Sequence, residues 1–222
     1  MHLIADAPHG NPVSDMVTIT EQKSGEWSPG LDAKERRSLM DTARDTLRWC
    51  AAGRRPALFD WKKRAVTDRL LEKRASFVTF RQRGDLRGCM GTLAAGDPLC
   101  KSVHVSAANA AEDPRFVHCP IRLQEVDSIE VRVTVLGPME HAPGPDAFEP
   151  GRHGIVLACR GRRAVFLAEV AVEQGWSRAR TLSELCLKAG LPAEAWKDGA
   201  DILLFESVVF VEDGCADRSP GY

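Results

Sequence analysis

Residues 128–136 read Ser-Ile-Glu-Val-Arg-Val-Thr-Val-Leu and give the clearest strand pattern in the 222-residue chain. From Ile129 to Val135, apolar β-branched side chains alternate with polar ones. This period of two predicts a strand with one apolar and one polar face. Aromatic and β-branched residues predict two further strands, at 76–81 and at 203–211.

The other regular elements follow from turn and capping signals. Two apolar runs on either side of an Arg-Gly-Arg turn predict a hairpin over residues 154–168. Capping boxes predict helices that begin at Asp32 and at Thr181, and a short helix is expected at 66–71. Small residues predict a closely packed helix at 102–112. Helices mixed with hairpin-like strands favour an α+β fold with a mainly antiparallel sheet and flanking helices.

The chain is expected to form one folded domain over residues 31–213. Residues 1–30 contain prolines and glycines without a regular apolar pattern, so a disordered N-terminal arm is expected there, and 214–222 is expected to be a disordered tail. Residues 137–151 contain four prolines and are expected to connect two lobes.

Composition excludes several classes of function. The 30 basic and 31 acidic residues give a net charge of -1, which provides no field for nucleic acid or an acidic membrane surface. No stretch approaches the ~18 continuous apolar residues of a membrane span. The seven cysteines are odd in number and form no Cys-x-x-Cys pair, which indicates a reducing compartment. A cytoplasmic protein without a structural metal or a cofactor is expected.

The segment Arg87-Gly88-Cys89-Met90-Gly91 is the best candidate for chemistry and is expected to be a loop. Glycines permit a close approach to Cys89, and the guanidinium of Arg87 favours the thiolate, which is the reactive form. The alternative is a strand–turn–strand with a small buried cysteine between glycines.

A thiol nucleophile also needs a base, and His153 is the best candidate because glycines lie close to it on both sides, just before an apolar strand. Asp113 can orient Arg115, and Asn109 shares a helical face with Asp113. Glu130 lies on the polar face of its strand and needs a cationic partner, for which Arg87 and Arg115 are the candidates if that face is covered.

Several motifs, taken together in this order, resemble the AMMECR family, whose bacterial and archaeal members are called AmmeMemoRadiSam system protein A. They are Leu86 to Gly91, Asp113 to Phe116, Ile129 to Leu136, His153 to Ile155, Phe166 to Val170, Gly175-Trp176 and Leu185 to Leu191. The chain departs from the family pattern at Ala168 and Glu169, where the family has proline and glutamine.

The resemblance implies two unequal lobes around a central cavity lined by residues 87–91. It also implies a Memo-type protein and a radical S-adenosylmethionine enzyme as partners. The first hypothesis is an enzyme or enzyme subunit with Cys89 as nucleophile or redox thiol, Arg87 and His153 as catalytic partners, and a small-molecule substrate. Substrate binding is assigned to Gly88, Gly91, Asn109, Asp113, Arg115 and Glu130. The alternatives are a non-catalytic binding or adaptor module and a thiolate metal site with Cys89 and His153 as ligands.

Overall fold

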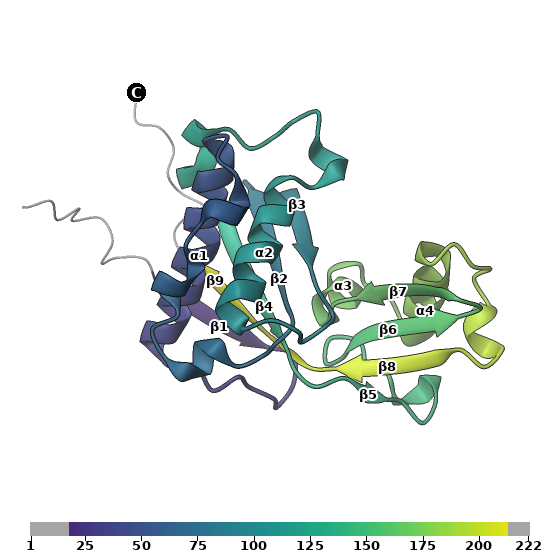
Figure 1. Cartoon of the computed structure of the whole chain (residues 1–222). Coiled ribbons are helices and arrows are strands. Elements are labelled where there is room, and N and C mark those ends of the chain that lie inside the picture. Colours follow the sequence, from purple (N-terminus) through teal and green to yellow (C-terminus); the bar gives the residue numbers. More distant parts are fainter. Residues whose placement is uncertain (1–17, 213–222) are drawn as a thin grey trace, which may run out of the picture.

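The computed structural model describes residues 18–212 and contains two antiparallel sheets with helices packed around them (Figure 1). The predicted α+β class is confirmed. The two sheets belong to a larger and a smaller lobe, which lie side by side (Figure 1). The expectations for residues 1–17 and for 213–222 lie outside the described residues.

The larger lobe is built on a five-stranded sheet with the order β1-β9-β4-β2-β3. Its strands are β1 (Ile19–Lys23), β2 (Ser76–Gln82), β3 (Asp85–Gly91), β4 (Glu130–Leu136) and β9 (Ser207–Glu212). The central strand β4 is the one that the alternating pattern predicts, and its three valines are fully buried. The register of β2 and β3 places Cys89 opposite Thr79.

Two helices, α1 (Ala33–Ala51) and α2 (Leu99–Ala111), cover one face of this sheet (Figure 1). The predicted capping box of α1 is present, because Asp32 accepts the Glu35 N–H at 2.8 Å and Glu35 accepts the Asp32 N–H at 2.8 Å. The helix expected at 66–71 is a shorter 3-10 turn. The 3-10 helices of this lobe are η2 (Pro56–Leu58), η3 (Trp61–Arg64), η4 (Asp68–Leu71), η5 (Pro114–Phe116) and η6 (Leu123–Ser128).

The smaller lobe has a four-stranded sheet with the order β5-β8-β6-β7. Its strands are β5 (Glu140–His141), β6 (Gly154–Cys159), β7 (Arg162–Phe166) and β8 (Asp201–Phe205). Its helices are α3 (Ala168–Glu173), α4 (Arg178–Lys188), η7 (Pro145–Ala147) and η8 (Ala195–Lys197). The predicted hairpin is β6–β7, whose turn places Arg160 at φ 51° and Gly161 at φ 74°, as a type I′ turn requires.

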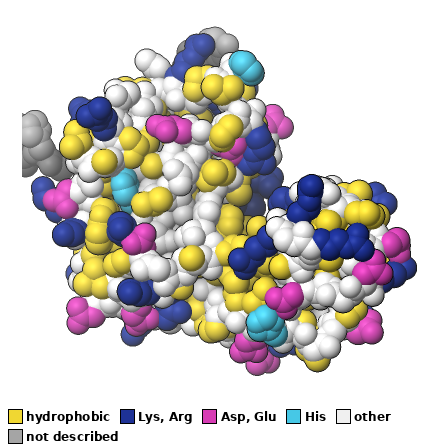
Figure 2. Space-filling model, turned by 45° about the vertical axis from the view of Figure 1, so that its right-hand side comes forward, with side chains coloured by type: hydrophobic (Ala, Val, Ile, Leu, Met, Phe, Trp, Pro, Cys, Tyr) yellow, Lys and Arg dark blue, Asp and Glu magenta, His cyan; other side chains and the backbone are white. Residues whose placement is uncertain are grey.

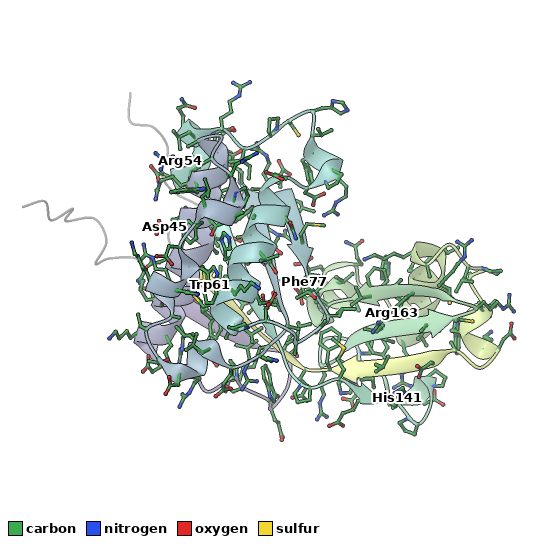
Figure 3. The ribbon with its side chains drawn as sticks, in the orientation of Figure 1. Asp45, Arg54, Trp61, Phe77, His141 and Arg163 are labelled. Atoms are coloured by element: carbon green, nitrogen blue, oxygen red, sulfur yellow. The ribbon has the colours of Figure 1, made fainter. Side chains whose placement is uncertain are left out.

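An apolar cluster joins the two lobes. Ala75 and Leu136 of the larger lobe pack with Val156 and Phe205 of the smaller one. Phe77 packs against the same cluster and lies where the lobes meet (Figure 3). Apolar side chains of both lobes therefore pack together in one cluster.

Three expectations are corrected by the structure. The strand expected at 203–211 is two strands, β8 in the smaller sheet and β9 in the larger one, separated by Glu206. Residues 19–23, expected to be part of a disordered arm, form β1 because they pair with β9 along its whole length. The helix expected to begin at Thr181 begins earlier, at Arg178, since Ser177 accepts the Arg180 N–H and Thr181 donates to the Ser177 carbonyl.

Gly154→Ala is expected to destabilise the protein by ~1–3 kcal/mol, because overpacking forces side chains from their rotamers. A Cβ at position 154 lies 2.3 Å from the ring of Phe205, which is buried in the interlobe cluster. Urea unfolding followed by circular dichroism measures the change. Gly96→Ala is the control, because a Cβ at Gly96 meets nothing within 4 Å. Equal stability of the two variants would contradict this packing.

Candidate functional site

Cys89 lies on a strand and not on a loop, which corrects the sequence expectation. It belongs to β3, the edge strand of the larger sheet, and lies opposite Thr79, which in turn lies opposite Arg132. Residues paired in this way share one face of a sheet. Gly88 faces α2, so Cys89 points to the other face, toward the smaller lobe.

The glycines around Cys89 make room for the protein's own atoms. A Cβ at Gly88 lies 2.1 Å from the Ala110 carbonyl oxygen, so its absence lets α2 pack closely on β3. A Cβ at Gly91 lies 2.3 Å from the Phe77 ring. The freedom that the sequence suggested for a ligand is therefore used by a helix and by the interlobe cluster.

Asp113 and Arg115 hold the backbone of Cys89 at the open edge of β3. The Cys89 N–H donates to Asp113 Oδ2 at 3.0 Å, and Arg115 Nη2 donates to the Cys89 carbonyl at 3.2 Å. The two side chains also form an ion pair of 2.6 Å. The hydrogen bond from Arg115 is the main cause that lowers the pKa of the buried Asp113 to about 2. The pair satisfies backbone groups that no strand partner reaches.

The structure directs Arg87 away from Cys89. The β2–β3 register skips Arg87, since Phe80 lies opposite Gly88 and Arg81 opposite Leu86. Arg87 donates to Gln82 and, at 3.3 Å, to Glu125. The guanidinium whose charge acts on the Cys89 thiol is that of Arg115. Glu130 also has another partner than expected, because Arg132 Nε lies 2.5 Å from its carboxylate.

His153 and Asn109 are not brought to Cys89. His153 Nδ1 accepts the Glu149 N–H at 3.1 Å, and the ring lines a pocket of about 410 Å³ together with Trp27 and Glu206. Within residues 18–212, no hydrogen bond joins His153 to Cys89. Asn109 is exposed on α2.

Two charged residues of the smaller lobe act on Cys89 and were missed in the sequence. Lys188 on α4 donates to the Val165 carbonyl at 2.9 Å and lies 4.7 Å from the Phe166 ring. Burial lowers the pKa of Lys188, and its charge interacts with Cys89. Glu169 on α3 also interacts with Cys89, and burial raises its pKa. In the sequence, each of these two residues is a single charged residue flanked by apolar ones, which is the pattern that could have identified it.

The surroundings of Cys89 favour the protonated thiol over the thiolate. Burial raises its pKa, and two effects only partly offset this: a hydrogen bond of 3.2 Å from the Thr79 hydroxyl to Sγ, and the charge of Arg115. The thiolate expected beside an arginine is therefore not the resting form. Formation of the thiolate requires a base or a ligand that changes this environment.

A groove of about 320 Å³ lies between α3 and the outer face of the larger sheet. It is lined by Gln22, Lys23, Ser24, Arg132, Gly151, Ala168, Glu169, Val172, Glu173, Ser207 and Val209. Figure 2 shows a notch between the lobes with Lys and Arg side chains beside it. Residues of both lobes thus line this groove, and Arg132 in its lining lies two strand spacings from Cys89, about 10 Å.

Two features are absent from the described part of the chain, a metal-binding cluster and a membrane-spanning helix. Residues 18–212 contain no group of three or more His, Cys, Asp or Glu side chains placed to hold a metal ion. None of the helices in this range combines the length and the hydrophobicity that a membrane crossing needs.

The fold and site define a two-lobed α+β protein with a cysteine between its lobes. The AMMECR1 family model matches residues 40–210, so the chain belongs to the AMMECR1 family. A protein of Methanopyrus kandleri is 38% identical over 163 residues, which are 68% of this chain and 78% of the relative. A protein of Nanoarchaeum equitans is 35% identical over 67% of this chain and 86% of its own.

A solved structure supports the same fold. The crystal structure of an uncharacterised protein from Pyrococcus horikoshii aligns with a TM-score of 0.75 and 30% sequence identity. The alignment covers 84% of this chain and 95% of that one. The two-lobed arrangement is therefore shared with an archaeal relative.

Asp113→Asn is expected to destabilise the protein by ~1–3 kcal/mol at neutral pH, since a charge-assisted contact to Arg115 is lost. The pKa of Asp113 is lowered to about 2 in the folded protein, against ~3.9 in an unfolded chain. The stabilisation is therefore full above pH ~4 and disappears as pH falls toward about 2. Urea unfolding at several pH values tests this, with the exposed Asp146→Asn as control. A difference from wild type that is independent of pH would refute the assignment.

Cys89 is expected to react with iodoacetamide ~10-fold or more slowly than Cys119 at pH 7.5, because only thiolates are alkylated efficiently. Cys119 is exposed, whereas Cys89 is half-buried and has a raised pKa. Peptide mass spectrometry over a time course measures both rates in one sample. The difference should disappear in denatured protein. Faster alkylation of Cys89 than of Cys119 in the folded protein would argue for a thiolate at rest.

Proposed function

We propose that this AMMECR1-family protein is an enzyme, or an enzyme subunit, that uses the Cys89 thiol on a small substrate bound between its lobes. One observation carries the proposal: charged side chains from both lobes, each with a shifted pKa, act on the thiol. Asp113 and Arg115 come from the larger lobe, and Glu169 and Lys188 from the smaller one. Such clusters are typical of functional sites.

The resting thiol must lose its proton before it acts as a nucleophile. Lys188 is the proposed base, because its lowered pKa increases the fraction of neutral amine that can take the proton from Cys89 Sγ. Arg115 then stabilises the thiolate, and Thr79 keeps the sulfur oriented by its hydrogen bond. Lys188 and Arg115 thus take the parts that the sequence analysis gave to His153 and Arg87.

A second function is favoured by a specific observation. The raised pKa of Cys89 and the packing of Gly88 and Gly91 against protein atoms also suit a binding module, in which the thiol is inert. In this alternative the interlobe site holds a small molecule or a segment of a partner protein. The two functions differ in whether removal of the sulfur abolishes turnover.

The proposed partners are a Memo-type protein and a radical S-adenosylmethionine enzyme, and they define the assay. The three purified proteins are incubated with a metabolite extract, and mass spectrometry identifies compounds whose loss requires all three. Cys89→Ala is expected to reduce this turnover by ~100-fold or more, as expected when a nucleophile is removed. Cys119→Ala, at an exposed thiol, is the matched control and should retain full turnover.

Lys188 variants separate a base from a mere positive charge. Lys188→Arg keeps the charge but holds its proton, so it should lose ~100-fold in turnover, the scale of general base catalysis. Lys188→Met removes both and should lose at least as much. Unchanged turnover in Cys89→Ala, with all variants folded by circular dichroism, would instead establish the binding module.

A further inference from the structure

We propose that the groove between α3 and the larger sheet binds a cationic group of the substrate, an amine or a guanidinium, with the Glu169 carboxylate as its counter-ion. The inference deepens the proposed function, because it assigns a substrate class to the site that contains Cys89. The binding step itself does not require a reactive thiol.

The groove lies within reach of Cys89 on the same face of the sheet. Arg132 lines the groove and lies opposite Thr79, which lies opposite Cys89. Two strand spacings separate Arg132 from Cys89, which is about 10 Å. A substrate with a cationic end in the groove and a chain of several atoms can therefore present its other end to the thiol.

One carboxyl group of the groove forms no ion pair. Lys23 lies 3.7 Å from Glu21, Arg132 lies 2.5 Å from Glu130, and Glu173 is held by Arg81 at 3.4 Å. For Glu169, which lines the groove, no ion pair is found among residues 18–212, and the charges of Arg132 and Arg81 act on it without a direct contact. Glu169 is therefore the groove carboxyl group that lacks a contacting cation, and a cation is the complementary ligand.

The environment of Glu169 supports the same conclusion. Burial is the main cause that raises its pKa and the nearby Glu173 carboxylate adds to it, while a hydrogen bond from its own backbone N–H and the charges of Arg132 and Arg81 offset this only in part. A carboxylate that is removed from water is unfavourable unless a positive charge or hydrogen bonds compensate it. A bound ammonium or guanidinium group would supply both.

A second polar group in the groove makes no hydrogen bond. The Ser207 side chain is 1% exposed and lines the groove, and its Oγ has no hydrogen-bond partner in the described structure. A buried hydroxyl without a partner is uncommon in folded proteins. The N–H groups of an amine or guanidinium can donate a hydrogen bond to this oxygen as well as to the carboxylate of Glu169.

Agmatine, which has a guanidinium and an amine joined by four methylene groups, is a suitable probe. Isothermal titration of the full chain is expected to show binding of agmatine at least ~10-fold tighter than that of 1,5-pentanediol, since a single charge contact supplies about that factor. Glutarate, a dianion of similar length, tests whether Lys23 and Arg132 attract the ligand instead.

Variants locate the binding. Glu169→Gln keeps the shape of the side chain and should weaken agmatine binding ~10-fold or more, and Ser207→Ala should weaken it less. Glu194→Gln, at an exposed ion pair with Lys197, is the matched control and should bind like wild type. Equal binding of agmatine and pentanediol, tighter binding of glutarate, or an unchanged affinity in Glu169→Gln would each overturn the proposal.

Cys89→Ala separates this inference from the proposed function. It should bind agmatine as wild type does, because the groove holds the cation without the sulfur. If Cys89→Ala retains turnover but Glu169→Gln loses agmatine, the cation site stands and the thiol mechanism fails. If the reverse holds, the thiol mechanism stands and the cation site fails.

Discussion

The arrangement of the molecule depends on two hydrogen-bonded crossings between its lobes. The chain leaves the larger sheet at Gly137 and returns to it at Glu206, and the Gly137 N–H donates to the Glu206 carbonyl at 2.8 Å. The Glu206 carboxylate accepts the Trp27 N–H at 2.7 Å and Arg152 Nε at 2.9 Å. One residue therefore links the β1–α1 connection, the smaller lobe and the return strand. The apolar cluster around Phe205 adds packing to these polar contacts.

The candidate site depends on those crossings because each lobe supplies half of it. The larger lobe holds the Cys89 backbone through Asp113 and Arg115 and contacts its sulfur through the Thr79 hydroxyl. The smaller lobe supplies Lys188 and Glu169, whose charges act on the thiol from the other side. A small rotation of one lobe would change the distances of Lys188 and Glu169 to the sulfur, while its backbone and its hydrogen bond from Thr79 stay in place.

The features that could be predicted from the sequence are those set by neighbouring residues. Alternation identified β4, the Asp32–Glu35 pair identified the start of α1, and the Arg160-Gly161 turn identified the hairpin. The break at Glu206 could not be predicted, since the apolar pattern continues from one sheet to the other. The motifs around Cys89 and Asp113 did predict that the two residues belong to one site. The sequence could not predict that the charge near the thiol is that of Arg115 and not of Arg87, because this results from a register irregularity.

The Asp113–Arg115 pair has a consequence beyond Cys89. β3 is an edge strand, and an uncovered edge presents backbone donors and acceptors to which a strand of another molecule can add. At Cys89 both outward groups are already occupied by side chains of the same molecule. The opening between the lobes can thus stay accessible to small molecules while this edge resists self-association by strand addition.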